Sequence, residues 1–178
     1  MCDHFHLSLQ SGCNETLKRM NRKYTAQSFR KEVELLRKTF PNVVLTTDVI
    51  VGFPGETEQE FNETYEYLKN IRFTKLHVFR YSPRKGTVAA KMKDQVDSKI
   101  KEERSHKLIK LSDKCEKEIL DKYIGKKVKV LFEKQEGEYI KGHTTNYLVV
   151  KIKDSKLENQ ILDINITSRE ELELIGKM

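Results

Sequence analysis

The sequence has few cysteines and no long apolar run. Its three cysteines, Cys2, Cys13 and Cys115, form no C-x-x-C pair, and so sparse and odd a set suits a reducing cytoplasm better than a secreted disulfide framework. Its longest apolar runs, such as 49–51, are far too short to span a bilayer. No apolar segment follows Met1 that could serve as a signal peptide. We therefore expect a cytoplasmic protein without a membrane segment.

Charge of both signs is abundant, and basic residues are in excess. The 178 residues contain 34 Lys and Arg against 27 Asp and Glu, a net charge of +7, while eight Phe and seven Tyr argue against disorder. Residues 1–120 hold 23 basic and 17 acidic residues, and residues 121–178 hold 11 and 10. A basic excess favours a polyanionic partner, nucleic acid first. The alternative is a protein that is merely rich in solvated lysines.

The first 80 residues alternate between strand and helix patterns. The alternation predicts parallel strands joined by crossover helices, an α/β fold. Ligands of such folds bind at the carboxyl ends of the strands, where this sequence places residues 10–12, Asp48 with 52–56, and 81–84. The predicted strands are 3–9, 43–51 and 75–81, and the predicted helices are 15–20 (capped by Asn14), 25–40 and 57–70 (capped by Thr57).

The pattern changes in the last third of the chain. A long helix is predicted over 98–123, with Ile100, Arg104, Leu108, Leu111, Cys115 and Ile119 at steps of three and four and Gly125 as its C-cap. Short alternating strands follow at 128–132, 139–144, 147–152 and 161–166. They predict a small antiparallel β-barrel or sandwich, so we place one domain at 1–123 and a second at 124–178.

Three long motifs carry a resemblance to a known family. The segments HLSLQSGCNETLKRMNRKYT, TTDVIVGFPGETEQEFNETYEYL and KLHVFRYSPRKGTVAAKM resemble the second half of the radical-SAM barrel of tRNA methylthiotransferases. The tail YIGKKVKVLFE…GEYIKGHTTNYLVVK is similar to the TRAM domain, an OB-like β-barrel that holds tRNA. The resemblance implies a partial (β/α) barrel followed by a TRAM domain, with the threonylcarbamoyladenosine-37 branch of the family as the best match.

The resemblance also implies cofactors and partners. The full-length enzymes bind S-adenosylmethionine and two 4Fe-4S clusters, and act on the anticodon loop of tRNA by forming a 5′-deoxyadenosyl radical that abstracts hydrogen from C2 of the adenosine. The C-x-x-x-C-x-x-C motif of the radical-generating cluster is absent from this sequence. We therefore expect no cluster in this chain, no metal site, and an inactive polypeptide when it is taken by itself.

Six residues are candidate contacts of S-adenosylmethionine. By the resemblance, Gln10, Arg22 and Asp48 reach the cofactor; a guanidinium suits its carboxylate and an amide or carboxylate suits its ribose. Alternatively, Arg22 and Asp48 pair with each other or with the backbone. Gly52 and Phe53 are candidates in the next loop, where Gly55 and Glu56 fit better as turn and helix start. Ser11 completes this set of candidates.

Basic and aromatic residues in two regions are candidate RNA contacts. Such residues suit RNA loops, whose phosphates attract cations and whose bases stack, although charged loops and strand faces often carry the same residues. The candidates are Arg80, Tyr81, Arg84 and Lys85 after the third strand, and Lys127, Lys141, His143, Asn146 and Tyr147 in the tail. His4 and His6 share one strand face, but the pair lacks a third ligand and is more typical of barrel lining.

Two other functions remain open from the sequence. In the first, the chain is a stand-alone RNA-binding module. In the second, it is part of a methylthiotransferase that acts on isopentenyladenosine tRNA or on an aspartate of a ribosomal protein. An incomplete barrel also predicts an exposed strand edge, through which chains could associate.

Overall fold

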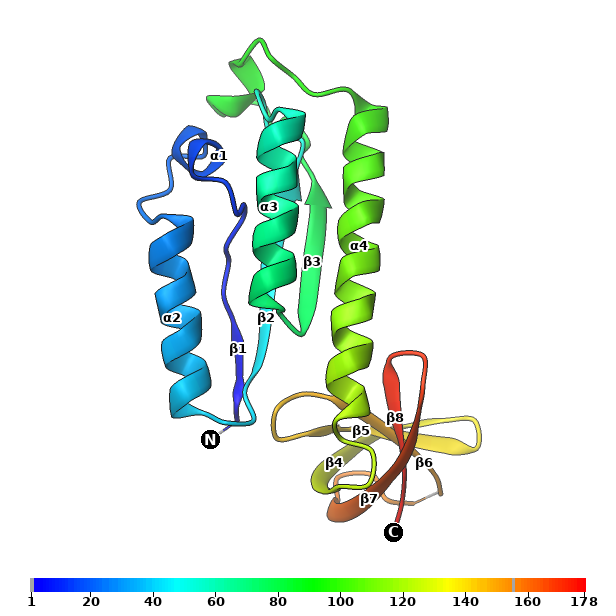
Figure 1. The fold of residues 1–178 in the computed structure, drawn as a ribbon. Helices are drawn as coiled ribbons and strands as arrows, with labels where there is room; N and C mark the ends of the chain where they lie inside the picture. Colours follow the sequence, from blue (N-terminus) through cyan, green and yellow to red (C-terminus); the bar gives the residue numbers. More distant parts are fainter. Residues whose placement is uncertain (1, 155) are drawn as a thin grey trace. The chain divides into compact units, whose positions relative to one another are not determined.

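The computed structural model describes residues 2–154 and 156–178, which form two compact units (Figure 1). One unit comprises residues 6–41 and 45–112, and the other comprises the N-terminal residues through Phe5, residues 42–44 and 113–178. The structure is a mixed α/β fold with a parallel sheet and a separate closed barrel, which confirms the predicted fold class. The predicted domain border between residues 123 and 124 stays a prediction, because the two units divide inside a helix.

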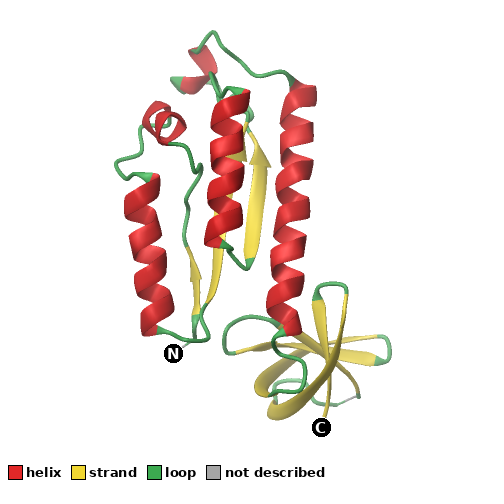
Figure 2. Ribbon diagram, viewed as in Figure 1, coloured by secondary structure: helices red, strands yellow, loops and turns green. Residues whose placement is uncertain are grey.

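The parallel sheet has three strands in chain order, joined by helices (Figure 2). In the pairing of the second and third strands, Thr46 lies opposite Lys75 and Val51 opposite Arg80. A parallel bridge between Gln10 and Val49 extends the contact of the first two strands. The elements are β1 (His4–His6), α1 (Asn14–Arg19), α2 (Ala26–Thr39), β2 (Val44–Val51), α3 (Glu58–Ile71), β3 (Lys75–Arg80) and the 3-10 turn η1 (Ala89–Lys91).

The two faces of this sheet differ in burial. Side chains alternate between the faces of a strand, and Leu45, Val49 and Leu76 are buried together with the helix residues Val33 and Phe61. The alternate residues are more open, and they carry the polar groups of the site. Those residues are His6, Asp48, Ile50, His77 and Phe79.

Helix starts were predicted with mixed success. Thr57 caps α3 as expected, in a capping box with Glu60. Asn14, however, does not cap α1, which begins at Asn14 itself and has Cys13 as its N-cap. Instead, the Asn14 Oδ1 accepts a hydrogen bond from the Ala26 N–H at 2.9 Å. The side chain thus serves the first turn of α2, a partner twelve residues away that local spacing does not reveal.

The long helix α4 (Ser98–Asp121) ends two residues earlier than predicted. Arg104 of the predicted row is buried, but Ile100 of the same row is exposed, and Lys101, which lies outside the row, is buried. Gly125 has a φ of +83°, but its N–H donates to the Ile166 carbonyl at 2.9 Å rather than to the helix. Gly125 therefore joins the barrel instead of capping α4.

The barrel closes in the order β4-β5-β6-β8-β7. Its interior is apolar, with Phe132, Ile140, Val150, Ile164 and Leu174 fully buried. It is not purely antiparallel as predicted, because β6 and β8 pair in parallel. The last strand, β8, escaped prediction. The elements are β4 (Lys127–Glu136), β5 (Tyr139–Thr144), β6 (Val149–Lys153), β7 (Ile161–Glu170) and β8 (Glu173–Lys177).

Candidate cofactor and nucleic-acid sites

A cavity of about 460 Å³ lies at the carboxyl ends of the parallel strands. This is the edge where α/β folds bind ligands, and the volume falls within the usual range for small-molecule sites. Three of the six candidate cofactor residues line it, and so do three of the four RNA candidates from the end of β3 and the loop after it. The lining residues are Gln10, Asp48, Ile50, Phe53, Phe79, Arg80, Tyr81, Ser82, Arg84, Thr87 and Ala89.

Gln10 and Asp48 are held next to each other by the backbone. The Gln10 N–H donates to the Asp48 carbonyl at 2.8 Å, and the Gln10 carbonyl accepts from the Ile50 N–H at 2.9 Å. Gln10 has a φ of +70°, which is uncommon for a residue with a side chain and is typical of a functional constraint. The Asp48 carboxylate accepts from the Ser8 hydroxyl at 3.2 Å and lies 3.2 Å from the His6 Nε2. The partners of the Asp48 carboxylate are thus Ser8 and His6, and not Arg22, the alternative partner considered from the sequence.

Aromatic rings form one wall of the cavity. Phe53 and Tyr81 meet edge to face with 5.2 Å between ring centroids, and the Lys101 ammonium lies 5.4 Å from the Tyr81 centroid. The Tyr81 hydroxyl oxygen is buried and finds no hydrogen-bond partner within the described ranges 2–154 and 156–178. A buried hydroxyl without a partner is costly, so this ring is held at the wall by its packing and not by a hydrogen bond of its own.

Ser11, Gly52 and Arg22 are not among the residues that line the cavity. The Ser11 hydroxyl lies 3.0 Å from the Thr64 hydroxyl and accepts from the Cys13 N–H, which ties the chain to α3. Gly52 has a φ of +70°, and a β-carbon there would overlap the Lys101 side chain. Arg22 is exposed. Ser11 and Gly52 therefore shape the loops beside the cavity, and a contact of either residue with the cofactor stays a prediction.

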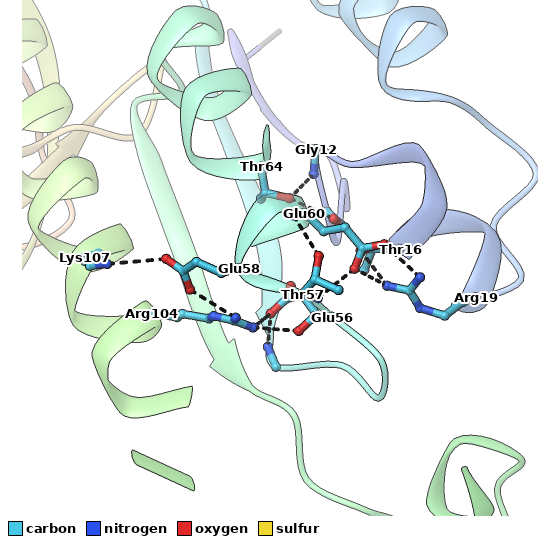
Figure 3. A network of polar contacts seen from close by, with 12 residues as sticks. Gly12, Thr16, Arg19, Glu56, Thr57, Glu58, Glu60, Thr64, Arg104 and Lys107 are labelled. Carbon is cyan, nitrogen blue, oxygen red and sulfur yellow. Dashed lines mark hydrogen bonds and ion pairs between the residues drawn. The ribbon is translucent and has the colours of Figure 1, made fainter. Parts of the chain in front are cut away.

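A buried ion pair fixes the loop between Gly52 and Glu56 (Figure 3). The side chains of Glu56 and Arg104 are 1% and 5% exposed, and their Oε2 and Nη1 atoms lie 2.7 Å apart. The same Glu56 oxygen accepts from the Gly52 N–H at 2.6 Å. Burial raises the pKa of Glu56, while Gly52 and Arg104 oppose that rise. Glu56 thus has the structural role expected for it. Its partner in that role is Arg104, which lies 48 residues further along the chain.

A second ion pair ties α1 to the start of α3 (Figure 3). Both Nη atoms of Arg19 donate to the Glu60 carboxylate, at 2.8 and 2.6 Å. Burial would raise the pKa of Glu60, but the hydrogen bonds from Arg19 and Thr57 outweigh it and hold the pKa below its usual value. The loop that carries Phe53 is therefore braced by charged pairs on both sides.

Sequence reasoning missed the apolar part of the cavity. Ile50 and Phe79 lie opposite each other on β2 and β3 and share a sheet face with Asp48 and Tyr81. Strand alternation from Asp48 would have found both residues. Thr87 and Ala89 come from the segment after β3, where the sequence carries no comparable signal. Lys85, the fourth candidate of that loop, is exposed and is not a lining residue.

The candidate RNA contacts on the barrel differ in how far other residues of the chain already occupy them. Lys141 is paired with Glu136 and Glu173 at 2.8 and 2.7 Å, and these partners raise its pKa. Lys127 lies 3.9 Å from Asp163 and remains exposed. Of the remaining candidates, His143 and Tyr147 stack on each other with centroids 4.5 Å apart.

Asn146 is 4% exposed, and its side-chain amide is already hydrogen-bonded. The Nδ2 group donates to the Tyr123 hydroxyl at 2.6 Å and to the Asn42 carbonyl at 2.8 Å. The Oδ1 accepts from the Thr144 hydroxyl at 2.7 Å. Asn146 therefore supports its turn, and its contact with RNA stays a prediction.

The His6 side chain lies on the face of the parallel sheet, as expected from its position in the first strand. Its ring lies 5.4 Å from that of His77, and its Nδ1 is 2.9 Å from the Thr46 hydroxyl. Within residues 2–154 and 156–178, no group of three or more His, Cys, Asp or Glu is arranged to hold a metal ion. Nor does any helix in those ranges have the length and apolarity to cross a membrane.

The class of protein follows from a family match. Residues 1–68 match the model of the radical SAM superfamily. Among solved structures, coproporphyrinogen III oxidase (HemN) from Escherichia coli, a radical SAM enzyme, superposes with a TM-score of 0.55 over 64% of this chain and 27% of that chain. At 18% identity, this likeness concerns the fold.

The particular family follows from curated relatives. The chain is 46% identical, over 86% of its length, to threonylcarbamoyladenosine tRNA methylthiotransferase MtaB of Bacillus subtilis (strain 168). It is 39% identical over its whole length to the tRNA-2-methylthio-N(6)-dimethylallyladenosine synthase of Acetivibrio thermocellus. The chain belongs to the radical-SAM tRNA methylthiotransferase family, and it spans 35% and 38% of the length of these two relatives.

Proposed function

We propose that this chain is the part of a tRNA methylthiotransferase that forms one wall of the S-adenosylmethionine site and holds the tRNA. The whole enzyme would add a methylthio group to C2 of N6-threonylcarbamoyladenosine at position 37, in the anticodon loop. The cavity at the strand ends is the observation that carries the proposal. The substrate follows the MtaB relative, which is 46% identical; dimethylallyladenosine is the second candidate, because its synthases match the whole chain at 39–41% identity.

The residues of the cavity fit an adenosine-containing cofactor. Asp48 and Gln10 offer a carboxylate and an amide for ribose hydroxyls, while Ile50, Phe53 and Phe79 offer apolar contact for a purine. When bound in the whole enzyme, the cofactor supplies the radical chemistry at C2. The residues of this chain bind and orient it.

The iron–sulfur clusters do not fit this chain. Cys2 is exposed, Cys13 and Cys115 are buried, and the described residues offer no metal-binding group. We therefore propose that the clusters belong to other parts of the whole enzyme and that the isolated chain is inactive. Reductive cleavage of S-adenosylmethionine by the chain, after reconstitution with iron and sulfide, would contradict this.

The cofactor proposal is tested by titrating S-adenosylmethionine into the chain in a calorimeter. Asp48→Asn keeps the shape of the side chain but removes its charge, and a hydrogen bond to a charged group is worth about 1.5–3 kcal/mol. We expect the Asp48→Asn variant to bind about 10-fold more weakly or worse. Asp94→Asn is the matched control, because Asp94 is exposed and is not a lining residue. Equal affinity of the Asp48→Asn variant and the unchanged chain would place the cofactor elsewhere.

The RNA proposal is tested by filter binding to tRNA over a range of salt concentrations. We expect tRNA that carries threonylcarbamoyladenosine to bind, with an affinity that falls linearly in log–log form as salt rises. Tighter binding of dimethylallyladenosine tRNA would favour the second candidate substrate. Indifference to every tRNA at low salt would contradict an RNA substrate altogether.

The two outer strands of the parallel sheet could allow two copies of the chain to associate. Within the described residues, β1 and β3 each pair with β2 and with no other strand. Open edges of this kind pair with further strands, and association of chains through an edge therefore stays part of the proposal.

A further inference from the structure

An apolar row crosses the outer surface of the barrel. Leu131 on β4 lies opposite Ile161 on β7 and opposite His143 on β5, which in turn lies opposite Val149 on β6. The side chains of Leu131 and Ile161 are exposed, at 39% and 66%. Lysines and carboxylates occupy much of the remaining outer face of these strands, so an exposed apolar row is out of place unless something binds it.

Tyr147 extends this row from the turn after β5. Its ring stacks on His143 with centroids 4.5 Å apart and planes inclined by 21°, and on His4 at 5.2 Å. The residue is nevertheless 62% exposed. Tyr147 thus contacts two histidine rings, while most of its own surface remains open to solvent.

The backbone of Tyr147 is left-handed, with a φ of +71°. Glycine and asparagine adopt this conformation readily, whereas an aromatic residue there is an outlier that persists only where the surroundings enforce it. Because the ring is exposed, burial in a core does not explain why a tyrosine occupies this position. A conformation of this kind points to function.

The turn is rigid without the Tyr147 side chain. The Tyr147 N–H donates to the Thr144 carbonyl and the Leu148 N–H donates to the Thr144 hydroxyl, both at 2.9 Å. The buried amide of Asn146 joins the turn to Tyr123 at 2.6 Å. These contacts involve the backbone of Tyr147 and the side chains of its neighbours, so they hold the ring outward and would survive its removal.

The charge next to the row suits an anionic partner. Lys129 and Lys127 precede Leu131 on the same face of β4 and share a single carboxylate, Asp163, at 3.2 and 3.9 Å. Two cations thus face one anion at this end of the row, while Glu133, on the same face beyond Leu131, pairs with His143. Stacked rings, apolar side chains and two neighbouring lysines together match an unpaired nucleotide, whose base stacks and whose phosphate is anionic.

We propose that an unpaired nucleobase of the RNA stacks on the Tyr147–His143 rings, with Leu131 and Ile161 against the neighbouring nucleotide and its phosphate near Lys127 and Lys129. The inference rests on the proposed RNA substrate and names how the barrel contacts it. Stacking, rather than the ion-paired lysines, then supplies the main contact.

The decisive variant is Tyr147→Asn, because asparagine accepts a left-handed backbone but offers no ring. We expect the thermal midpoint to stay or to rise, while the affinity for a tRNA anticodon stem-loop falls about 10-fold, the loss of one base stack. The slope of affinity against salt stays unchanged, since no charge is removed. Tyr147→Phe keeps the ring and is expected to bind as the unchanged chain does.

Glu171→Asn is the matched control. Glu171 lies between β7 and β8 with a φ of +49°, so this variant relieves the same kind of backbone strain on the same barrel without removing a ring. We expect its RNA affinity to match that of the unchanged chain. A stem-loop with 2-aminopurine in the loop gives a direct readout of stacking, and its quenching should be lost in Tyr147→Asn and kept in Tyr147→Phe.

The outcomes separate this inference from the proposed function. If the unchanged chain binds tRNA and Tyr147→Asn binds equally well, the stacking proposal is overturned, the RNA proposal stands, and the row is left to a protein partner. A fall in the thermal midpoint of Tyr147→Asn that accounts for its loss of binding also overturns the inference, since the ring would then be packing. If the unchanged chain binds no tRNA, both proposals fail.

Discussion

Ion pairs differ sharply between the loop beside the cavity and the surface of the barrel. Glu56 and Arg104 are almost completely buried and hold a backbone loop in place. On the barrel, the pairs of Lys153 with Glu138 and of Lys134 with Glu136 have similar lengths, 2.9 and 3.3 Å, but lie in solvent. The same residue types are therefore structural in one region and nearly free of consequence in the other, since burial decides the cost of losing a partner.

The largest expected effect comes from Arg104→Met, which keeps an apolar stem but leaves Glu56 buried without its cation. Breaking a buried pair costs about 3–5 kcal/mol, and we expect a loss of that size in the free energy of unfolding by urea. Arg169→Met is the comparison, because Arg169 pairs with the exposed Asp121 at 2.8 Å. Equal losses in the two variants would erase the distinction between the regions.

The next effect comes from backbone proximity in the barrel. Gly142 on β5 lies so close to β4 that a β-carbon would overlap the Leu131 carbonyl, a backbone group that cannot rotate away. We expect Gly142→Ala to lower the free energy of unfolding by about 1–3 kcal/mol through overpacking. In the parallel-sheet unit, a β-carbon on Gly12 would meet the Tyr67 side chain at 2.8 Å, so Gly12→Ala should cost less. The reverse order would contradict this ranking.

The smallest effect concerns acid stability. Because the pKa of Glu60 lies below its usual value of about 4.5, its carboxylate stabilises the fold above that pH, and the contribution is lost as the pH falls through the lowered value. Glu60→Gln removes this contribution. The difference in thermal midpoint between Glu60→Gln and the unchanged chain should therefore shrink as the pH falls below about 4.5. A difference that stays constant with pH would assign the effect to the capping hydrogen bond alone.

The main elements of the fold could be predicted because local patterns carry them. Alternation and apolar spacing placed β2, α3 and α4 within a few residues, since these patterns follow from the period of each element. The errors lie where a distant partner decides. Asn14 serves α2 instead of α1, and Lys101 is buried on α4 although Ile100 beside it is exposed.

The candidate site shows the same limit. Gln10, Asp48 and Phe53 line the cavity, while their neighbours Ser11 and Gly52 are held by Thr64 and Glu56. A sequence motif marks adjacent residues as equally good candidates. Only the structure shows which of two neighbours lines the cavity and which is held by other residues. Asn146 and Tyr147 repeat the pattern on the barrel, where one is buried and the other exposed.

The Glu56–Arg104 pair sets a rule for building chimaeras within this family. The loop that carries Phe53 takes its shape from a guanidinium supplied by a helix 48 residues downstream. A graft that takes the parallel sheet from one relative and α4 from another must therefore keep both partners from a single parent. A crossover placed after Ser112 keeps Arg104, and also the hydrogen bond from the Leu76 N–H to the Ser112 hydroxyl, with the sheet they serve.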